Sequence, residues 1–330
     1  MPNEIDGAGR EGSASRSPLS DAASPRIVFM GTPEFAVASL DAILEAGYNV
    51  VGVVTAPDKP AGRGMQLAES AVKKYAVTRG LLVLQPEKLR DPGFLSELQL
   101  LRADLQIVVA FRMLPEIVWN MPPMGTVNLH GSLLPQYRGA APINWAVING
   151  ETVTGATTFR LQHAIDTGGI LLQEKFFISD TDTAGDVHDH MMKVGADLLV
   201  ATIGGLVAGT LHEVPQKDSP ELKHAPKIFT ETCRIDWNKT TVEVYNLIRG
   251  LSPFPAAFTF LDGKMLKIFR SEKEVSGEVL PGGGPGKLHT DGKTFLRFST
   301  ANGWIRITEL QLEGKKKMGV EEFLRGYRPK

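Results

Sequence analysis

The strongest constraint on the fold is a strand, a helix and a second strand that follow one another near the start of the chain. Residues 26–30 (RIVFM) and 49–55 (NVVGVVT) are apolar, β-branched runs. Between them, Thr32 offers a helix cap, Pro33 suits a first turn, and Glu34 complements the helix dipole. Two buried strands joined by a helix normally pair in parallel, so the sequence predicts an α/β fold with a mostly parallel sheet.

The alternation of strands and helices continues as far as residue 209. Apolar runs predict the strands, and helical spacing of apolar residues predicts most of the segments between them. We expect strands at 81–85, 105–111, 125–130, 156–162 and 170–178, the last two paired, and helices at 68–79, 91–101, 114–119, 142–148 and 183–209. This order is typical of a Rossmann-like domain.

The composition and the periodicity of the sequence change after residue 210. Residues 211–232 are polar, contain three prolines and lack periodicity, which predicts a linker. Short alternating runs then predict a small β-barrel, with strands at 256–261, 265–270, 277–280, 286–290, 294–299 and 304–311 and a helix at 242–249. Because 330 residues are many for one core, we expect two domains, at 25–210 and 233–330.

Several features bear on the compartment. Residues 1–24 are polar and rich in Gly, Ser and Ala, which predicts a disordered extension and not a signal peptide. Cys233 is the only cysteine, so it forms no internal disulfide and fits a reducing cytoplasm. No apolar run approaches the roughly 20 residues that span a bilayer. We expect a cytoplasmic monomer with no membrane partner and no metal.

Charge is unevenly distributed. The segment from residue 225 onward holds 18 Lys and Arg against 12 Asp and Glu, a net charge of +6, while the whole chain carries −1. A basic C-terminal part on an acidic body indicates a polyanionic partner. The alternative is that a few Lys-rich loops happen to fall in this part.

A dinucleotide site at the first strand is the main alternative for an α/β chain of this kind. The first turn reads GTPEFA, which lacks the three glycines of the dinucleotide fingerprint, and no Walker A lysine motif is present. Pro33 stands where the backbone would need to approach a pyrophosphate. A nicotinamide oxidoreductase is therefore supported by the fold alone.

The segment NLHGSLLP (128–135) carries the best candidate chemistry. It begins at the end of a predicted strand, where α/β sheets bind ligands. Asn128 and His130 alternate with Leu129 and project to one side, so together they suit stabilisation of an oxyanion and handling of a proton. An isolated pair of this kind is also compatible with satisfied polar groups in a core.

An aspartate downstream strengthens the catalytic interpretation. Asp166 lies in HAIDTGG (163–169), between two predicted strands, and a carboxylate near an imidazole raises the histidine pKa and orients the ring. His163 in the same loop is a rival histidine, for which we favour a structural role.

The chain closely resembles the 10-formyltetrahydrofolate-dependent formyltransferases. HGSLLP with the later DTG carries this resemblance, and RIVFMGTPEFA, TAPDKPAGRGMQL and NLHGSLLPQYRGAAPINWAVINGE narrow it to the methionyl-tRNA formyltransferase family. The match runs from Arg26 to the C-terminus, where RIDW, IRGLSPFPAA and GKKKM also fit. The resemblance implies 10-formyltetrahydrofolate as formyl donor, methionyl initiator tRNA as acceptor, and an OB-like second domain that binds tRNA.

The resemblance also implies roles for individual residues. Asn128, His130 and Asp166 match the catalytic trio. Residues expected to contact folate are Ser132, Leu133, Leu134, Pro135, Ala110, Phe111, Arg112, Leu114, Ile165, Thr167 and Gly168. Residues expected to contact tRNA are Arg63, Lys315, Lys316 and Lys317.

One stretch departs from the family pattern. Residues 110–115 read AFRMLP, where members often carry a YG pair and one more residue. Arg112 either contacts the glutamate tail of the folate or alters the pocket wall.

Two other formyl acceptors are possible alternatives for such a chain. They are glycinamide ribonucleotide, whose formylation needs only the first domain, and the amine of a sugar nucleotide. The alternative outside the enzymes is a non-catalytic protein that binds tRNA.

The trio suggests direct transfer. The methionyl amine attacks the formyl carbon, Asn128 and protonated His130 stabilise the oxyanion, and Asp166 keeps His130 charged and orders a water that moves protons.

Overall fold

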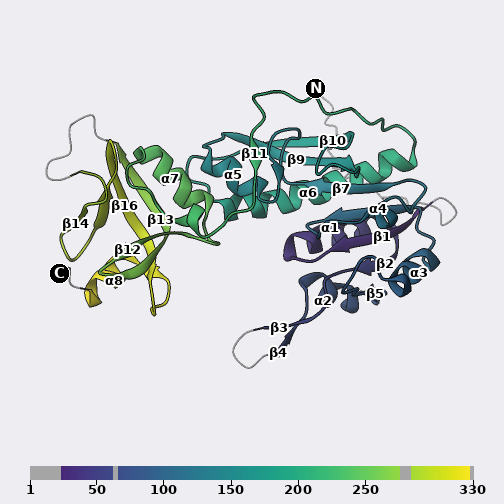
Figure 1. The fold of residues 1–330 in the computed structure, drawn as a ribbon, viewed down its shortest axis with the longest axis horizontal. Helices are drawn as coiled ribbons and strands as arrows, with labels where there is room; N and C mark the ends of the chain where they lie inside the picture. The colour runs from purple at the N-terminus through teal and green to yellow at the C-terminus, as the bar shows by residue number, and fades with distance from the viewer. Residues whose placement is uncertain (1–23, 62–65, 276–283, 328–330) are drawn as a thin grey trace, which may run out of the picture.

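The computed structural model describes residues 24–61, 66–275 and 284–327. The chain forms two parts that lie end to end, an α/β part that contains β1 to α6 and a β-rich part that contains α7 to α8 (Figure 1). The mixed α/β fold predicted from the sequence is confirmed.

The first part is built on a seven-stranded sheet with the order β10-β9-β7-β6-β1-β2-β5. The strands from β7 to β5 pair in parallel, and β9 pairs antiparallel with both β7 and β10. Their bounds are β1 (Arg26–Gly31), β2 (Asn49–Val54), β5 (Val83–Leu84), β6 (Leu105–Val109), β7 (Thr126–His130), β9 (Val153–Arg160) and β10 (Ile170–Phe177).

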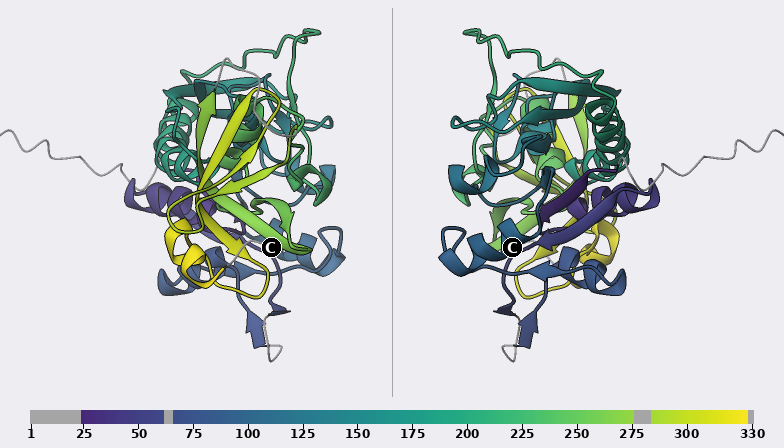
Figure 2. Two further views of the ribbon diagram at one scale, coloured as in Figure 1. Left: turned by 90° about the vertical axis from the view of Figure 1, so that its left-hand side faces the viewer. Right: turned by 90° about the vertical axis from the view of Figure 1, so that its right-hand side faces the viewer.

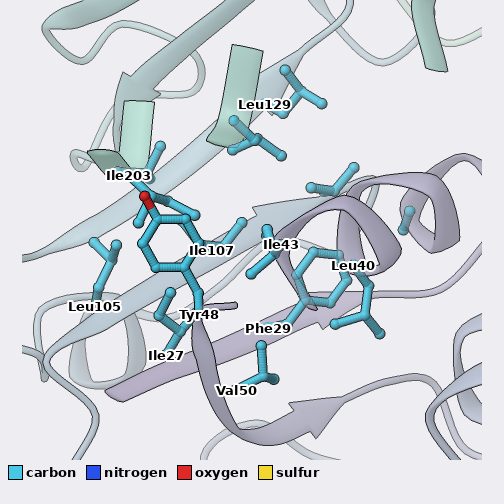
Figure 3. Close-up of a cluster of buried hydrophobic side chains, with 14 of the residues drawn as sticks. Ile27, Phe29, Leu40, Ile43, Tyr48, Val50, Leu105, Ile107, Leu129 and Ile203 are labelled. Carbon is cyan, nitrogen blue, oxygen red and sulfur yellow. The ribbon is translucent and has the colours of Figure 1, made fainter. Parts of the chain in front are cut away.

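Helices cover both faces of this sheet. The bounds are α1 (Glu34–Glu45), α2 (Ala71–Thr78), α3 (Pro92–Leu100), α4 (Glu116–Trp119), α5 (Pro142–Ile148) and α6 (Ala184–Val207). One core lies under α1, α2 and α6, with Phe29, Leu40, Ile107 and Leu129 among its buried side chains (Figure 3). A second core lies on the other face, under α3 and α4. Successive side chains of β7 therefore point alternately to one face of the sheet and to the other.

The expectation that no apolar run approaches a membrane-spanning length is corrected at α6, whose 24 residues are long and apolar enough, by length and composition only, to cross a membrane. It is the one such helix in the part of the chain that the structure describes. Met191, Leu199 and Ile203 are buried against the sheet and α1, which is the packing of a core helix. A capping box at Thr183 and Asp186 starts it.

The second part is an antiparallel sheet with the order β12-β13-β16-β15-β14, and β17 pairs with β16. The bounds are α7 (Thr241–Gly250), β12 (Ala257–Leu261), β13 (Lys264–Val275), β14 (Leu288–Thr290), β15 (Leu296–Ser299), β16 (Gly303–Leu312), β17 (Met318–Gly319) and α8 (Val320–Gly326). Its core packs Val244 and Ile248 of α7 against Leu266, Ile305 and Ile307. The small β domain expected here is confirmed, and among the described residues the sheet stays open, with β12 and β14 at its edges.

Some details of the prediction are wrong. Thr32 does not cap α1, because Pro33 occupies the N-cap position in an extended conformation and no side chain caps it. The strand expected at 105–111 ends at Val109, because Ala110 has a φ of 47° and turns the chain. The strand expected at 277–280 lies outside the described residues.

The sequence did not predict several short elements. The hairpin of β3 (Lys59–Ala61) and β4 (Gln66–Ala68) projects from the body (Figures 1 and 2). Helix α8 was not expected either. Such elements are too short to develop a periodic pattern.

The segment 211–232 lies along the first part. Val214 bridges Ile170, and β11 (His224–Ala225) pairs in parallel with β8 (Arg138–Gly139). A short 3₁₀ turn, η1 (Glu231–Cys233), then leads into the second part. This path brings residues far along the sequence to the loop that follows β7.

Candidate active site

Strand β7 places Asn128 and His130 at the carboxyl end of the parallel sheet. Val127 and Leu129 belong to the core under α1 and α6, so Asn128 and His130 project to the opposite side. Asn128 is in register with Val108 of β6, and His130 with Thr157 of β9. The two polar side chains therefore lie about 7 Å apart along one strand face, where neighbouring strands end.

The buried imidazole of His130 has a distinct group at each nitrogen. Nε2 lies 2.9 Å from the carbonyl oxygen of Tyr137, and Nδ1 lies 3.8 Å from Oδ2 of Asp166. A carbonyl oxygen only accepts hydrogen bonds, so Nε2 must carry a proton. Nδ1 is therefore the nitrogen that can gain or lose a proton, and it faces a carboxylate.

Asp166 is fixed from two sides. Its backbone has a φ of 55°, in the left-handed region, and its Oδ2 accepts a hydrogen bond of 3.0 Å from the backbone N–H of Gly139. The side-chain amide of Gln216 donates to the carbonyl oxygens of Asp166 and Gly168, at 2.9 and 2.8 Å. The carboxylate is thus held beside His130 by the loop after β7 and by the segment between the two parts.

Gly168 allows the loop of Asp166 to pass close to the sheet. A Cβ atom at this position would lie 1.6 Å from the carbonyl oxygen of Arg160 at the end of β9. No side chain fits such an approach, so a glycine is required two residues after Asp166.

The side chain of Asn128 is half-buried and forms no hydrogen bond with any residue in the described ranges. A half-buried amide usually finds a partner in the protein or in solvent. Its two N–H donors are thus available to a ligand at the same strand end as His130.

Internal bonds hold the loop after His130 against the sheet. The hydroxyl of Ser132 donates to the carbonyl of Gln136 at 2.6 Å. Leu134 is buried; its N–H donates to Thr157 Oγ1 at 3.1 Å, and its carbonyl accepts from Gln173 at 2.9 Å. Leu133 and Pro135 are half-buried in the same loop.

The segment after β6 forms the neighbouring wall. The register of β6 and β7 ends at Val109 and Leu129, so Ala110 is the first residue after β6 and His130 is the last residue of β7. The guanidinium of Arg112 donates to the carbonyls of Pro86 and Glu87 and lies 5.6 Å from the Phe111 ring. Arg112 is therefore engaged with the loop after β5. Leu114 is buried in the core under α4.

The remaining predicted residues differ in their surroundings. Ile165 is exposed, and the Thr167 hydroxyl donates to the carbonyl of Ala164 at 3.0 Å. Arg63 lies outside the described residues. Lys315, Lys316 and Lys317 form an exposed turn between β16 and β17, far along the chain from the trio.

His163 lies on the surface beside Glu116 and Trp119. Its Nε2 is 3.3 Å from the Glu116 carboxylate, and its ring stands edge-on to Trp119 at 5.4 Å. These contacts fit the structural role expected for it.

The sequence predicted no contact between the trio and Tyr137, Gly139 or Gln216, although all three contact it. Tyr137 and Gly139 act through backbone groups, which any residue type carries, and Gln216 lies in a segment without periodicity. No spacing signal was available to find them.

Two cavities lie in the described part of the first domain, and one of them is close to the trio. One of about 200 Å³ lies behind the loop after β7 and is lined by Leu133, Gln136, Tyr137, Glu151, Val153, Thr154 and Lys223. The other, of about 680 Å³, lies beyond β5. Strands β6, β1 and β2 separate β5 from β7, which puts the second cavity roughly 20 Å from the trio. In the described ranges, no group of three or more His, Cys, Asp or Glu residues is arranged to hold a metal.

Both parts of the chain match known family models. Residues 25–203 match the formyl transferase family, and residues 227–328 match the C-terminal domain of formyl transferases. The chain is 57% identical over 313 residues to a methionyl-tRNA formyltransferase from Parabacteroides distasonis, an alignment that covers 92% of this chain and 96% of the relative.

Solved structures share the fold at low identity. An N-formyltransferase from Helicobacter canadensis, in complex with folinic acid and dTDP-3-aminofucose, superposes with a TM-score of 0.63 at 20% identity, over 89% of this chain and 100% of that one. HypX from Aquifex aeolicus, in complex with tetrahydrofolic acid, superposes with a TM-score of 0.60 at 20% identity, over 93% of this chain and 48% of that one.

Proposed function

The chain belongs to the formyl transferase family, and on this premise we propose that it formylates the α-amino group of methionyl initiator tRNA. The formyl donor is 10-formyltetrahydrofolate, and the product is formylmethionyl-tRNA for the initiation of translation. The high identity over nearly the whole length of a methionyl-tRNA formyltransferase carries this assignment, since it includes both domains.

One observation supports the catalytic role of the trio. The Asn128 amide, which has no hydrogen-bond partner among the described residues, lies on one strand face with the Nδ1 edge of His130, and Asp166 lies 3.8 Å from Nδ1. Two donors and a carboxylate suit a reaction in which negative charge develops on an oxygen while protons move.

In the proposed reaction the neutral methionyl amine attacks the formyl carbon and forms a new C–N bond. Negative charge develops on the formyl oxygen, where the Asn128 amide and the N–H at Nδ1 of protonated His130 stabilise it. Asp166 favours the protonated imidazole, and water ordered by its carboxylate carries the amine proton to N10 as the bond from N10 to the formyl carbon breaks.

Folate contacts are proposed for the two loops that border the trio. The loop after β7 contributes Ser132, Leu133, Leu134 and Pro135, and the wall after β6 contributes Ala110, Phe111, Arg112 and Leu114. Ile165, Thr167 and Gly168 flank Asp166. The half-buried Leu133 and Pro135 and the reversal of the chain at Ala110 support this placement.

We also propose separate functions for three segments of the chain. Residues 25–210 carry out catalysis, 211–232 connect the domains, and 233–330 bind tRNA, with Arg63 and Lys315 to Lys317 as contacts. The two family matches and the basic charge of the second domain support this division. The protein would act as a cytoplasmic monomer without a membrane partner, which gel filtration and cell fractionation test.

A single assay tests the assignment of the acceptor. The purified protein is offered labelled 10-formyltetrahydrofolate with methionyl initiator tRNA, glycinamide ribonucleotide or an amino-sugar nucleotide. We expect label on the methionyl group alone. Transfer to a sugar nucleotide amine would contradict the proposal and favour the alternative acceptor.

A further inference from the structure

Tyr137 stands in an unusual position behind the catalytic histidine. Its φ is 60°, in the left-handed region that few tyrosines adopt, and its side chain is buried. Its carbonyl accepts the hydrogen bond from His130 Nε2 at 2.9 Å, and its own N–H donates to the carbonyl of Lys223 at 2.6 Å. This one peptide segment therefore joins the histidine to the segment between the domains.

The side chain of Tyr137 is held by polar contacts. Its hydroxyl donates to Glu151 at 2.5 Å and accepts from Asn149 at 3.1 Å. Glu151 also accepts a hydrogen bond of 2.5 Å from the ammonium group of Lys223. Burial and the bond to Glu151 raise the pKa of Tyr137, so the phenol stays protonated and remains a donor.

Although it borders a cavity, the Tyr137 side chain is buried in an apolar cluster with Ala146, Val147, Ile178, Val187 and Ala225. Tyr137, Glu151 and Lys223 line the cavity of about 200 Å³ behind the loop after β7. Because packing is incomplete on the cavity side, the hydrogen bonds with Glu151 and Asn149 add to the apolar packing in fixing the ring. A shift of the ring would move the attached carbonyl, which is the partner of His130.

We propose that Tyr137, tethered by Glu151 and Lys223, is a positioning residue that sets the tautomer of His130. The proposal rests on the role proposed for His130 in formyl transfer. The carbonyl keeps the proton of the neutral ring on Nε2 and leaves Nδ1 free to exchange a proton opposite Asp166. The tether extends to Lys223, so the segment that leads to the second domain contacts the catalytic histidine through one intermediate residue.

The first test is a spectroscopic one that needs no substrate. Nitrogen-15 spectra of histidine-labelled protein at about pH 8.5, above the ordinary histidine pKa, report which ring nitrogen is protonated. His130→Gln identifies the signal of His130 among the seven histidines. We expect the Nε2–H form in the native protein and a mixture of the two forms in Tyr137→Phe, which loses only the tether.

Tyr75→Phe is the matched control. Tyr75 also donates its hydroxyl to a carboxylate, that of Asp41, but does so between α2 and α1. This variant should keep the native His130 spectrum. An unchanged His130 spectrum in Tyr137→Phe, or an equal change in Tyr75→Phe, would overturn the proposal.

Kinetics provide the second test. We expect Tyr137→Phe to lower kcat about tenfold, a fraction of the contribution of general acid–base catalysis, with little change in KM for either substrate. Glu151→Gln keeps an acceptor for the tyrosine but loses the charge that pairs with Lys223, so it should have a smaller effect and serves as a second variant if Tyr137→Phe folds poorly.

The double variant Tyr137→Phe/Lys223→Met separates a shared network from independent effects. Effects on kcat that are less than multiplicative would support one network, and fully multiplicative effects would argue against it. The tautomer measurement is independent of the acceptor. If His130→Ala retained full turnover, the proposed mechanism would fail, whereas the tautomer measurement would still decide the role of Tyr137.

Discussion

His130 Nδ1 and Asp166 Oδ2 lie 3.8 Å apart. This distance is within the range of an ion pair but is too long for a good hydrogen bond. The carboxylate is already bound to the N–H of Gly139 at 3.0 Å, which holds it at this distance. Nδ1 and the carboxylate therefore face each other without a direct hydrogen bond.

His130→Ala and Asn128→Ala should each lower turnover by about 10²–10³, the usual cost of losing one oxyanion donor. Circular dichroism checks that the fold is intact, and His163→Ala provides a control, since His163 is an exposed histidine of the same domain. Near-native turnover in either catalytic variant would contradict the roles assigned to these residues.

Asp166→Asn tests the charge separately from the geometry. The amide oxygen can still accept the hydrogen bond from Gly139, so the loop should keep its shape. Loss of the negative charge removes the carboxylate that the proposed mechanism pairs with protonated His130, and kcat should fall while KM for the folate changes little. A rise in KM with unchanged kcat would instead indicate that Asp166 binds substrate.

Gly168→Ala should destabilise the first domain and impair catalysis together. The added Cβ would lie 1.6 Å from the carbonyl oxygen of Arg160, so either the strand end or the Asp166 loop must move. We expect a clear fall in Tm and in kcat. Gly47→Ala is a useful comparison, because its φ of 82° also favours glycine while no atom lies within 4 Å of the added Cβ. A Tm loss confined to the size seen for Gly47→Ala would show that the close approach is unimportant.

The sequence predicted the parts of the site that depend on periodicity. The strand predicted at 125–130 is β7, and its alternation is readable because Val127 and Leu129 enter the core while Asn128 and His130 face the other side. The contacts of Tyr137 and Gln216 could not be predicted in this way. They depend on backbone carbonyls and on a two-residue pairing between β8 and β11, and neither leaves a signature in residue types.

The interface between the domains offers a prediction about acid stability. Asp186 caps α6 with Thr183 and lies 3.3 Å from Arg270 of the second domain. Burial raises the pKa of Asp186, but hydrogen bonds from Thr183 and the charge of Arg270 outweigh it and lower the pKa overall. The stabilisation is therefore present above the ordinary carboxylate pKa and is lost as the pH falls through the lowered value.

Asp186→Asn should accordingly lower the free energy of unfolding at neutral pH and leave a smaller difference from the native protein in acid. Thr183→Ala removes the cap itself and should cost about 1 kcal/mol. Urea titrations at a series of pH values measure both effects. A deficit in Asp186→Asn that stays constant down to strongly acidic pH would contradict the ionic contribution.

The turn of three lysines between β16 and β17 is proposed to bind tRNA, and its charges can be tested by substitution. Lys316 lies 3.4 Å from Glu322 and Lys317 lies 3.0 Å from Glu309, so each is partly neutralised by a neighbour, whereas the structure gives no such acidic neighbour to Lys315 among the described residues. Replacing all three by glutamine should raise KM for tRNA and flatten its salt dependence, by about one logarithmic unit of slope for each phosphate that is no longer neutralised. Lys315→Gln should account for the largest single share, because its charge is the least compensated. KM for the folate should not change. If the salt dependence of the triple variant equals that of the native protein, the turn is a solvated surface and the tRNA lies elsewhere on the basic domain.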